Sequence, residues 1–258
     1  MGFGIAGGIL SIVPRSTNVL FIADGATFVL AAVIILGIPS LGGGSISAPV
    51  SGGIRRSWEV VAARPHLVIG TLAAFLIPMS YPALLALAYH VSNQGGQMYS
   101  ILEVVSSAGI FVGSVVVSRF AAIGTMRTVA AGLLLTGIFS FSISLSSELA
   151  VIGIALFLAS MGNPIYAVAN QTALIEAADP SRRGSVMATR FGLVQTASVV
   201  GAAVGGLITN QLSPAAAYGV LGVGLVMVAL YAIAAGRSTT NPLHGAAYEE
   251  ATLRQAKT

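Results

Sequence analysis

One carboxylate lies deep within an apolar stretch, where it could carry a proton. Glu103 falls in the stretch 97–120, about two turns from one end, with no basic residue within helical reach. A carboxylate inside a membrane is costly unless it faces a watery cavity or becomes protonated. Because drying raises the proton affinity of a carboxylate and hydration lowers it, Glu103 is a candidate for proton coupling. The alternatives are a side chain that reaches the interface or one that only bonds a neighbour.

Asp24 is a second carboxylate within an apolar stretch, at residues 19–38. It is the other candidate for proton coupling. A structural role is favoured, because an acidic group near a helix start is stabilised there and can bond Thr17 or Asn18.

Polar side chains at helical spacing indicate a possible binding surface. Asn163, Tyr166 and Asn170 recur at one-turn intervals and would share one face of a helix. With Gln195 on the next apolar stretch, they are candidates to line a cavity for an amphipathic molecule. Hydrogen bonding between helices explains the same pattern equally well.

Other chemistries find no support in the sequence. The chain has no cysteine and three scattered histidines, and it contains no HExxH, phosphate-loop or dinucleotide motif. We therefore expect no metal, no cofactor and no enzyme activity. The arginines stand singly or in pairs between apolar stretches, so the positive net charge does not indicate nucleic-acid binding.

The composition indicates that these residues belong to membrane-spanning helices. Hydrophobic residues make up 55% of the 258 residues and charged residues only 8%, whereas a soluble domain is about a quarter charged. A span needs about 20 apolar residues. The stretches that satisfy this are 19–38, 67–91, 97–120, 127–144, 151–175, 186–210 and 215–235, and 1–13 is too short. The sequence predicts an all-α, polytopic helical bundle.

The positive charges predict the orientation of the bundle. If the turns alternate across the membrane, eleven of the twelve Lys and Arg fall on one side and only Arg15 on the other. Cytoplasmic loops carry the excess of Lys and Arg. We therefore expect a multi-pass protein of the inner (plasma) membrane with a cytoplasmic C-terminus.

The chain is predicted to have four parts. Residues 1–38 would form the last part of an N-terminal helical bundle. Residues 39–66 would be a cytoplasmic linker, rich in Gly and Ser, with a short interfacial helix. Residues 67–236 would form a six-helix bundle, and 237–258 a polar tail. Pro78 and Pro82 predict a kink in the first helix of that bundle.

An internal repeat links the two ends of the chain. Gly-Gly pairs stand at 7–8 and 205–206, and the same offset carries the stretch 19–38 onto 217–236. Two consecutive helices therefore recur at one spacing, as expected of a transporter built from two parallel halves.

These motifs resemble the major facilitator superfamily, especially its drug-efflux and siderophore-export branch. The two Gly-Gly segments are similar to the glycine-rich motif that ends its fifth and eleventh helices. Residues 21–28 resemble the start of its sixth helix. Residues 118–120 are similar to its loop after helix eight without the acidic residue, so no gating role is transferred to them. The resemblance implies that the chain holds helices five (partial) to twelve and is truncated before them.

The segment Asp179, Arg182, Arg183, Gly184 is similar to the family's cytoplasmic loop between helices ten and eleven. Ser185 stands where another Arg is common.

The resemblance implies secondary active, proton-coupled export of a small amphipathic molecule, by rocking of two bundles about a central site. The partners would be this substrate, the lipid bilayer, the proton and the N-terminal half. The alternatives are an inactive fragment or non-transporting membrane partner, and an importer of a small polar solute.

Overall fold

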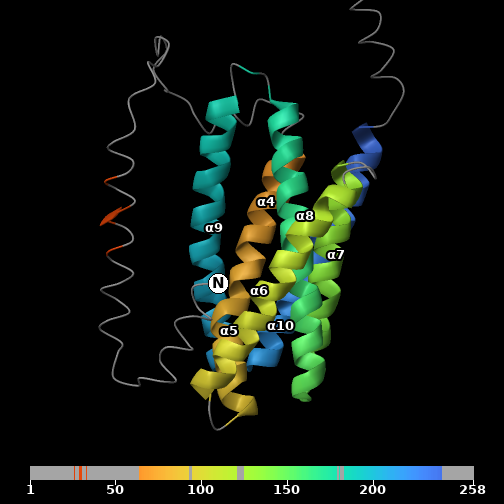
Figure 1. Ribbon diagram of the computed structural model, residues 1–258. Coiled ribbons are helices and arrows are strands. Elements are labelled where there is room, and N and C mark those ends of the chain that lie inside the picture. The colour runs from red at the N-terminus through yellow and green to blue at the C-terminus, as the bar shows by residue number, and fades with distance from the viewer. Residues whose placement is uncertain are drawn as a thin grey trace, which may run out of the picture.

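The computed structural model describes residues 64–92, 95–120, 125–178, 180 and 183–239, together with Ala26, Val29, Leu30 and Val33. Among the described residues between 64 and 239, the elements are helices only. Their order is α4, η2, α5, α6, α7, α8, α9 and α10 (Figure 1). Their bounds are α4 Arg64–Leu76, η2 Ile77–Met79, α5 Ser80–Val91, α6 Gly95–Phe120, α7 Thr125–Ser144, α8 Leu149–Ala177, α9 Arg183–Gln211 and α10 Pro214–Thr239.

Six segments of this described part are long and apolar enough to cross a membrane, with α4, η2 and α5 forming one of them. The predicted all-α polytopic bundle is therefore confirmed. The expectations for the stretches 1–13 and 19–38, for Asp24, for the linker and for the tail from 240 onward lie outside the described residues.

The break between α4 and α5 has a local cause in the sequence. A 3₁₀ turn spans Ile77–Met79 with Pro78 at its centre, because the proline ring removes one backbone donor and clashes with the preceding turn. Pro82 is the third residue of α5, where helix amides have no partner within the helix, so it causes no second break. At the two prolines for which a kink was predicted, the structure thus has one 3₁₀ turn, at Pro78.

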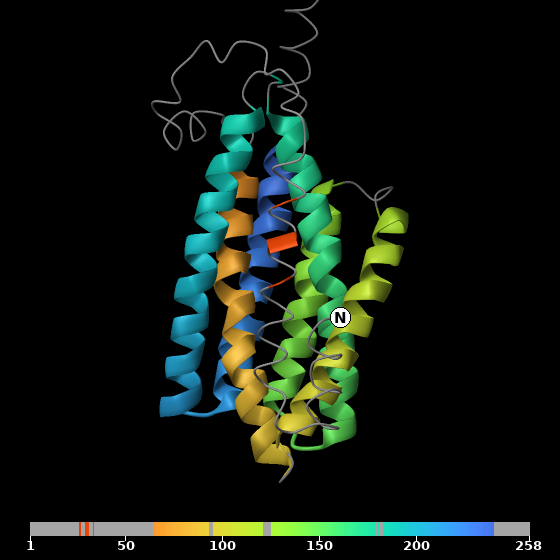
Figure 2. The same ribbon diagram turned by 60° about the vertical axis from the view of Figure 1, so that its left-hand side comes forward.

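The packing order places α7 at the centre of one side of the bundle. It contacts α8 and α10 most extensively, α8 also packs on α6, and α4 packs on α9. Figures 1 and 2 show the helices running side by side along one common direction. The end of α8 and the start of α9 lie at the upper end, and the end of α5 and the start of α6 lie at the lower end.

Glycines bring the helix backbones of neighbouring pairs into contact. A Cβ at Gly109 or Gly113 of α6 would overlap the backbone of α8 at Phe157 or Met161. Gly132 and Gly162 stand against each other between α7 and α8, and Gly137 and Gly222 form a similar pair between α7 and α10. Small residues allow this close approach. Inside lipid there is no hydrophobic driving force between helices, so van der Waals contact at such points stabilises their association.

Side-chain hydrogen bonds reinforce two of these contacts. The hydroxyls of Ser106 and Ser160 lie 2.8 Å apart between α6 and α8. Thr136 of α7 donates to the carbonyl of Ala159 in α8 at 3.0 Å. These bonds satisfy polar groups that water cannot reach at this depth.

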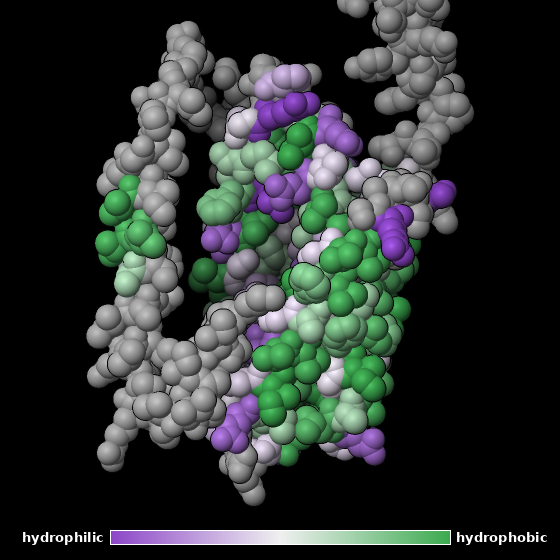
Figure 3. Space-filling model, viewed as in Figure 1, coloured by the Kyte–Doolittle hydropathy of each residue, from purple (hydrophilic) through white to green (hydrophobic). Residues whose placement is uncertain are grey.

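The outer surface of the bundle is apolar. Many large hydrophobic side chains of the described helices are more than two-fifths exposed, including Phe111, Ile154 and Met227. Figure 3 shows hydrophobic residues covering most of the lower right of one face, with hydrophilic residues gathered toward its upper end. This is the surface expected of helices that contact lipid.

The contact between α9 and α4 yields the first prediction. A Cβ at Gly201 would overlap the carbonyl oxygen of Phe75, so Gly201→Ala is expected to lower the free energy of unfolding by about 1–3 kcal/mol, the usual cost of overpacking. Thermal unfolding of the purified protein in detergent, followed by circular dichroism, measures the change.

Gly192→Ala is the matched control on the same helix. No atom outside its own helix turn lies within 4 Å of a Cβ there, and alanine favours a helix over glycine by about 1 kcal/mol. This variant should unfold at the same temperature as the wild type or higher. Equal unfolding temperatures for the two variants would contradict the close packing of α9 on α4.

Candidate functional site

Glu103 is half-buried in the first half of α6. Tyr99 lies one turn before it, and the Tyr99 hydroxyl forms a side-chain hydrogen bond to the Glu103 carboxylate. The i, i+4 spacing places both side chains on one face of α6, so this bond follows from the sequence. Glu103 is therefore neither unpaired nor fully enclosed.

Tyrosines from two other helices lie within electrostatic range of this carboxylate. Tyr81 of α5 and Tyr218 of α10 lie close enough to Glu103 to interact electrostatically with it. Tyr81 is 59% exposed, so the group is open on one side. Tyr218 is only 1% exposed, and its hydroxyl is buried with no hydrogen-bond partner within the described part of the chain. We call Tyr81, Tyr99, Glu103 and Tyr218 the tyrosine–glutamate cluster.

The predicted polar face of α8 divides into two environments. Asn170 is 1% exposed, and both ends of its amide bond to α4. Its Nδ2 donates to the carbonyl of His66 at 3.1 Å, and its Oδ1 lies 3.0 Å from Nδ1 of the same histidine. Asn163, two turns earlier, is half-buried. The structure thus places Asn170 in a link between α4 and α8.

Gly70 leaves space for this link, and the pattern of hydrogen bonds fixes the tautomer of His66. A Cβ at Gly70, one turn after His66, would lie 3.0 Å from Nδ2 of Asn170, so the glycine makes room for the amide. Because Nδ2 must be the donor to a carbonyl, Oδ1 is the atom that faces the histidine ring. Nδ1 of His66 therefore carries a proton and donates it to Oδ1.

Tyr166 and Arg190 are brought together from α8 and α9. Tyr166 is 8% exposed, and the charge of Arg190 acts on its hydroxyl. Nε of Arg190 is buried with no hydrogen-bond partner among the described residues. Gln195 is exposed on α9. The four predicted cavity residues thus have different exposures: Tyr166 and Asn170 are buried, Asn163 is half-buried and Gln195 is exposed.

The cytoplasmic-loop motif is described only in part. Nε of Arg183 donates to the carbonyl of Ala178 at 3.3 Å, which ties the start of α9 to the end of α8. Gly184 is exposed, with open space around it. Asp179 and Arg182 lie outside the described residues.

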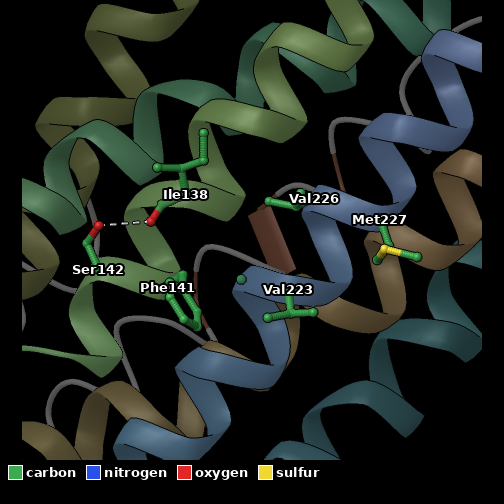
Figure 4. A pocket seen from close by; sticks show the side chains of 7 residues that line it. Ile138, Phe141, Ser142, Val223, Val226 and Met227 are labelled. Carbon is green, nitrogen blue, oxygen red and sulfur yellow. Dashed lines mark hydrogen bonds between the residues drawn. The ribbon is translucent and has the colours of Figure 1, made fainter.

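A groove of about 240 Å³ lies away from all of these groups, between α7 and α10. Figure 4 shows its lining, which is Ile138, Phe141, Ser142, Gly222, Val223, Val226 and Met227. Ser142 donates to the carbonyl of Ile138 at 3.0 Å, so its hydroxyl is already satisfied. The groove offers no unmet polar group and contains none of the predicted site residues.

Two features of these sites were not predicted from the sequence. His66 was assigned no role, although it bonds Asn170 across 104 residues. Tyr81 and Tyr218 were not connected with Glu103, because periodicity orders residues along one helix and does not identify the facing helix. The bond from Tyr99 could have been found, since its spacing to Glu103 is a helical pair.

A bundle of six spanning segments, with polar groups enclosed between helices, defines a multi-pass membrane protein. No group of three or more His, Asp or Glu suited to a metal ion occurs in the part that the structure describes. The sequence model of the Major Facilitator Superfamily matches residues 66–255. The chain belongs to that superfamily, so it is a membrane transporter and not an enzyme.

Comparison with curated proteins and with solved structures found no match.

The link between α4 and α8 gives the second prediction. Asn170→Ala removes both bonds and leaves Nδ1 of His66 without its acceptor, whereas the His66 carbonyl keeps its bond within α4. An unsatisfied buried group costs about 1–3 kcal/mol, so the free energy of unfolding should fall by about 1–3 kcal/mol. The thermal unfolding temperature measures the loss.

Asn163→Ala is the matched control, because Asn163 is half-buried on the same helix. Its effect should stay below about 1 kcal/mol. An Asn170→Ala variant as stable as the Asn163→Ala variant would show that the His66 bonds contribute nothing to stability.

Proposed function

We propose that this transporter is a secondary active exporter of a small amphipathic molecule, such as a drug or a siderophore-like compound, and that Glu103 couples export to proton entry. The observation that carries the proposal is the position of Glu103. Among the acidic residues that the structure describes, Glu148 lies in a connection and Glu176 is exposed at the end of α8, whereas Glu103 is half-buried within α6.

The surroundings of Glu103 support a coupling role. Its carboxylate has the Tyr99 hydroxyl as a hydrogen-bond donor. The side chain is only half-buried, so its hydration depends on whether the cavity is open at that end. A carboxylate whose hydration changes during transport also changes its proton affinity. Proton binding and release can then be linked to opening toward either side.

The least buried spans support a two-bundle mechanism. α6 and α9 have the smallest buried share of the six described spans, and they flank the side on which α4 and α8 are linked. We propose that these two helices face the N-terminal bundle and that rocking of the bundles alternates access to a site near Tyr166 and Asn163.

We further propose that the protein lies in the inner (plasma) membrane with its C-terminus in the cytoplasm, as the distribution of Lys and Arg predicts. Asp24 is retained as a second coupling candidate. Asn170 and Gln195 are retained as contributors to the cavity wall, with Asn170 acting through its link to His66.

The third prediction tests proton coupling. In vesicles that contain the intact protein, an imposed pH gradient should drive movement of ethidium, used as an amphipathic probe. Glu103→Gln should reduce gradient-driven movement by at least about tenfold, because the amide cannot exchange a proton. Equilibrium binding of ethidium should change little. Dye fluorescence follows transport, and equilibrium dialysis follows binding.

Glu148→Gln is the matched control, since Glu148 is exposed just before α8. It should transport like the wild type. Undiminished pH-driven movement in Glu103→Gln would refute the coupling role. Loss of binding together with transport would make Glu103 a ligand contact. An inactive wild type would favour the non-transporting alternative.

A further inference from the structure

The groove between α7 and α10 has no part in the proposed mechanism. It has a volume of about 240 Å³, and residues of both helices form its walls (Figure 4). Ile138, Val223 and Met227 line it and are each more than half exposed, so the groove opens on the outside of the bundle. The outside of a membrane-spanning bundle contacts acyl chains and not water. The material that fills the groove therefore comes from the membrane.

Contacts between α10 and the end of α7 give the depth of the groove. A Cβ at Gly219 would lie 3.6 Å from the side chain of Ser144, the last residue of α7, and a Cβ at Gly222 would crowd the backbone of Phe141. The two helices are therefore antiparallel. At 1.5 Å per residue, the groove residues of α7 lie about 3–9 Å from its end. Because α7 has 20 residues, about the length that crosses the hydrocarbon core, this end lies near the lipid headgroups.

The size and the walls of the groove disfavour a further helix as its occupant. One helical turn, about 10 Å wide and 5.4 Å long, occupies about 400 Å³, which is more than the groove offers. Helices that associate inside lipid also need small residues where they meet, whereas Ile138, Phe141, Val223 and Met227 are large. A flexible hydrocarbon chain can follow such a surface, so the shape favours an acyl chain.

The lining of the groove is also chemically suited to hydrocarbon. Ser142 is its one polar side chain, and its hydroxyl already donates to the carbonyl of Ile138 at 3.0 Å. An apolar cavity of about 150 Å³ binds benzene and stays free of water, so a groove of about 240 Å³ has room for a longer apolar segment. A chain held between two walls gains dispersion contacts that a flat helix surface does not supply.

The charges at this end of the bundle select the headgroup. The chain has no Lys or Arg between residues 128 and 181 or between residues 191 and 236, so no basic side chain of α7, α8, α9 or α10 is available there. Glu148 is exposed four residues after the end of α7. Anionic lipids are held by basic residues, and a carboxylate repels them. A headgroup that carries an ammonium group and no net charge satisfies both conditions.

We propose that the groove between α7 and α10 binds one acyl chain of a zwitterionic phospholipid, whose headgroup lies at the level of the end of α7. The chain would cover the contact at which Gly137 and Gly222 bring α7 and α10 together. The lipid site goes beyond the proposed function and does not depend on it, because no residue of the groove belongs to the transport site.

Native mass spectrometry of the full chain in detergent tests the site, with palmitoyl-oleoyl phosphatidylethanolamine as the probe. The wild type should bind a first lipid molecule before any others. Val223→Trp should weaken this first binding step at least about tenfold, because the indole takes the place of the chain and of its dispersion contacts. Ile138→Trp, on the facing wall, should have the same effect. Circular dichroism shows that each variant is folded.

Val220→Trp is the matched control, since Val220 is 45% exposed on the same helix and does not line the groove. It should bind the first lipid as tightly as the wild type. Folded Val223→Trp and Ile138→Trp variants that also bind like the wild type would overturn the lipid site.

Two further outcomes test the identity of the occupant. Palmitoyl-oleoyl phosphatidylglycerol should bind more weakly than phosphatidylethanolamine, and equal or tighter binding would show that the assignment to a zwitterionic lipid is wrong. A dimer of the wild type that Val223→Trp dissociates would show that a second copy of the chain covers the groove, which also overturns the proposal. Transport activity enters none of these measurements, so a failure of the proposed function leaves the lipid site standing.

Discussion

Contact between helix backbones at glycine is the interaction on which the rest of this bundle depends. Inside lipid, apolar side chains gain little by leaving one apolar surface for another. The helices must therefore gain stability from close van der Waals contact, and the α6–α8, α7–α8 and α7–α10 interfaces each contain glycines at which a Cβ would crowd the facing backbone. A larger residue at these points would separate the helices and reduce dispersion contacts along the whole interface.

Close packing also determines how polar groups are placed. Where backbones touch, no water can enter, so each enclosed side chain must find a protein partner. Ser106 and Ser160 bond each other across one glycine-rich interface, and Thr136 bonds a carbonyl across another. Arg190, Thr209 and Tyr218 depart from this pattern, since Nε, Oγ1 and the phenol hydroxyl of these side chains are buried with no hydrogen-bond partner in the described part of the chain.

The sequence was sufficient for the architecture, but not for the pairing between helices. Apolar length predicted the spans, and Pro78 and Pro82 predicted a kink in the helix, where the structure has a 3₁₀ turn at Pro78. Both predictions depend on local backbone physics. Glu103 stood out because a charge in an apolar helix is costly wherever the helix lies. The bond between His66 and Asn170 could not be predicted, since their 104-residue separation becomes a contact only after α4 and α8 have packed. Helical spacing predicted which face of its own helix Asn170 occupies, but it could not predict which residue of another helix bonds it.

The link between α4 and α8 also constrains how this region can change in evolution. Asn170 needs an acceptor and a donor on His66, and it needs the space that Gly70 leaves. A change at any one of the three positions leaves a polar group without its hydrogen-bond partner or fills the space that the amide occupies. The three positions should therefore covary among relatives, with a bulkier residue at position 70 accompanied by a smaller one at position 170. An ancestral lineage could cross between two such combinations only through a less stable intermediate.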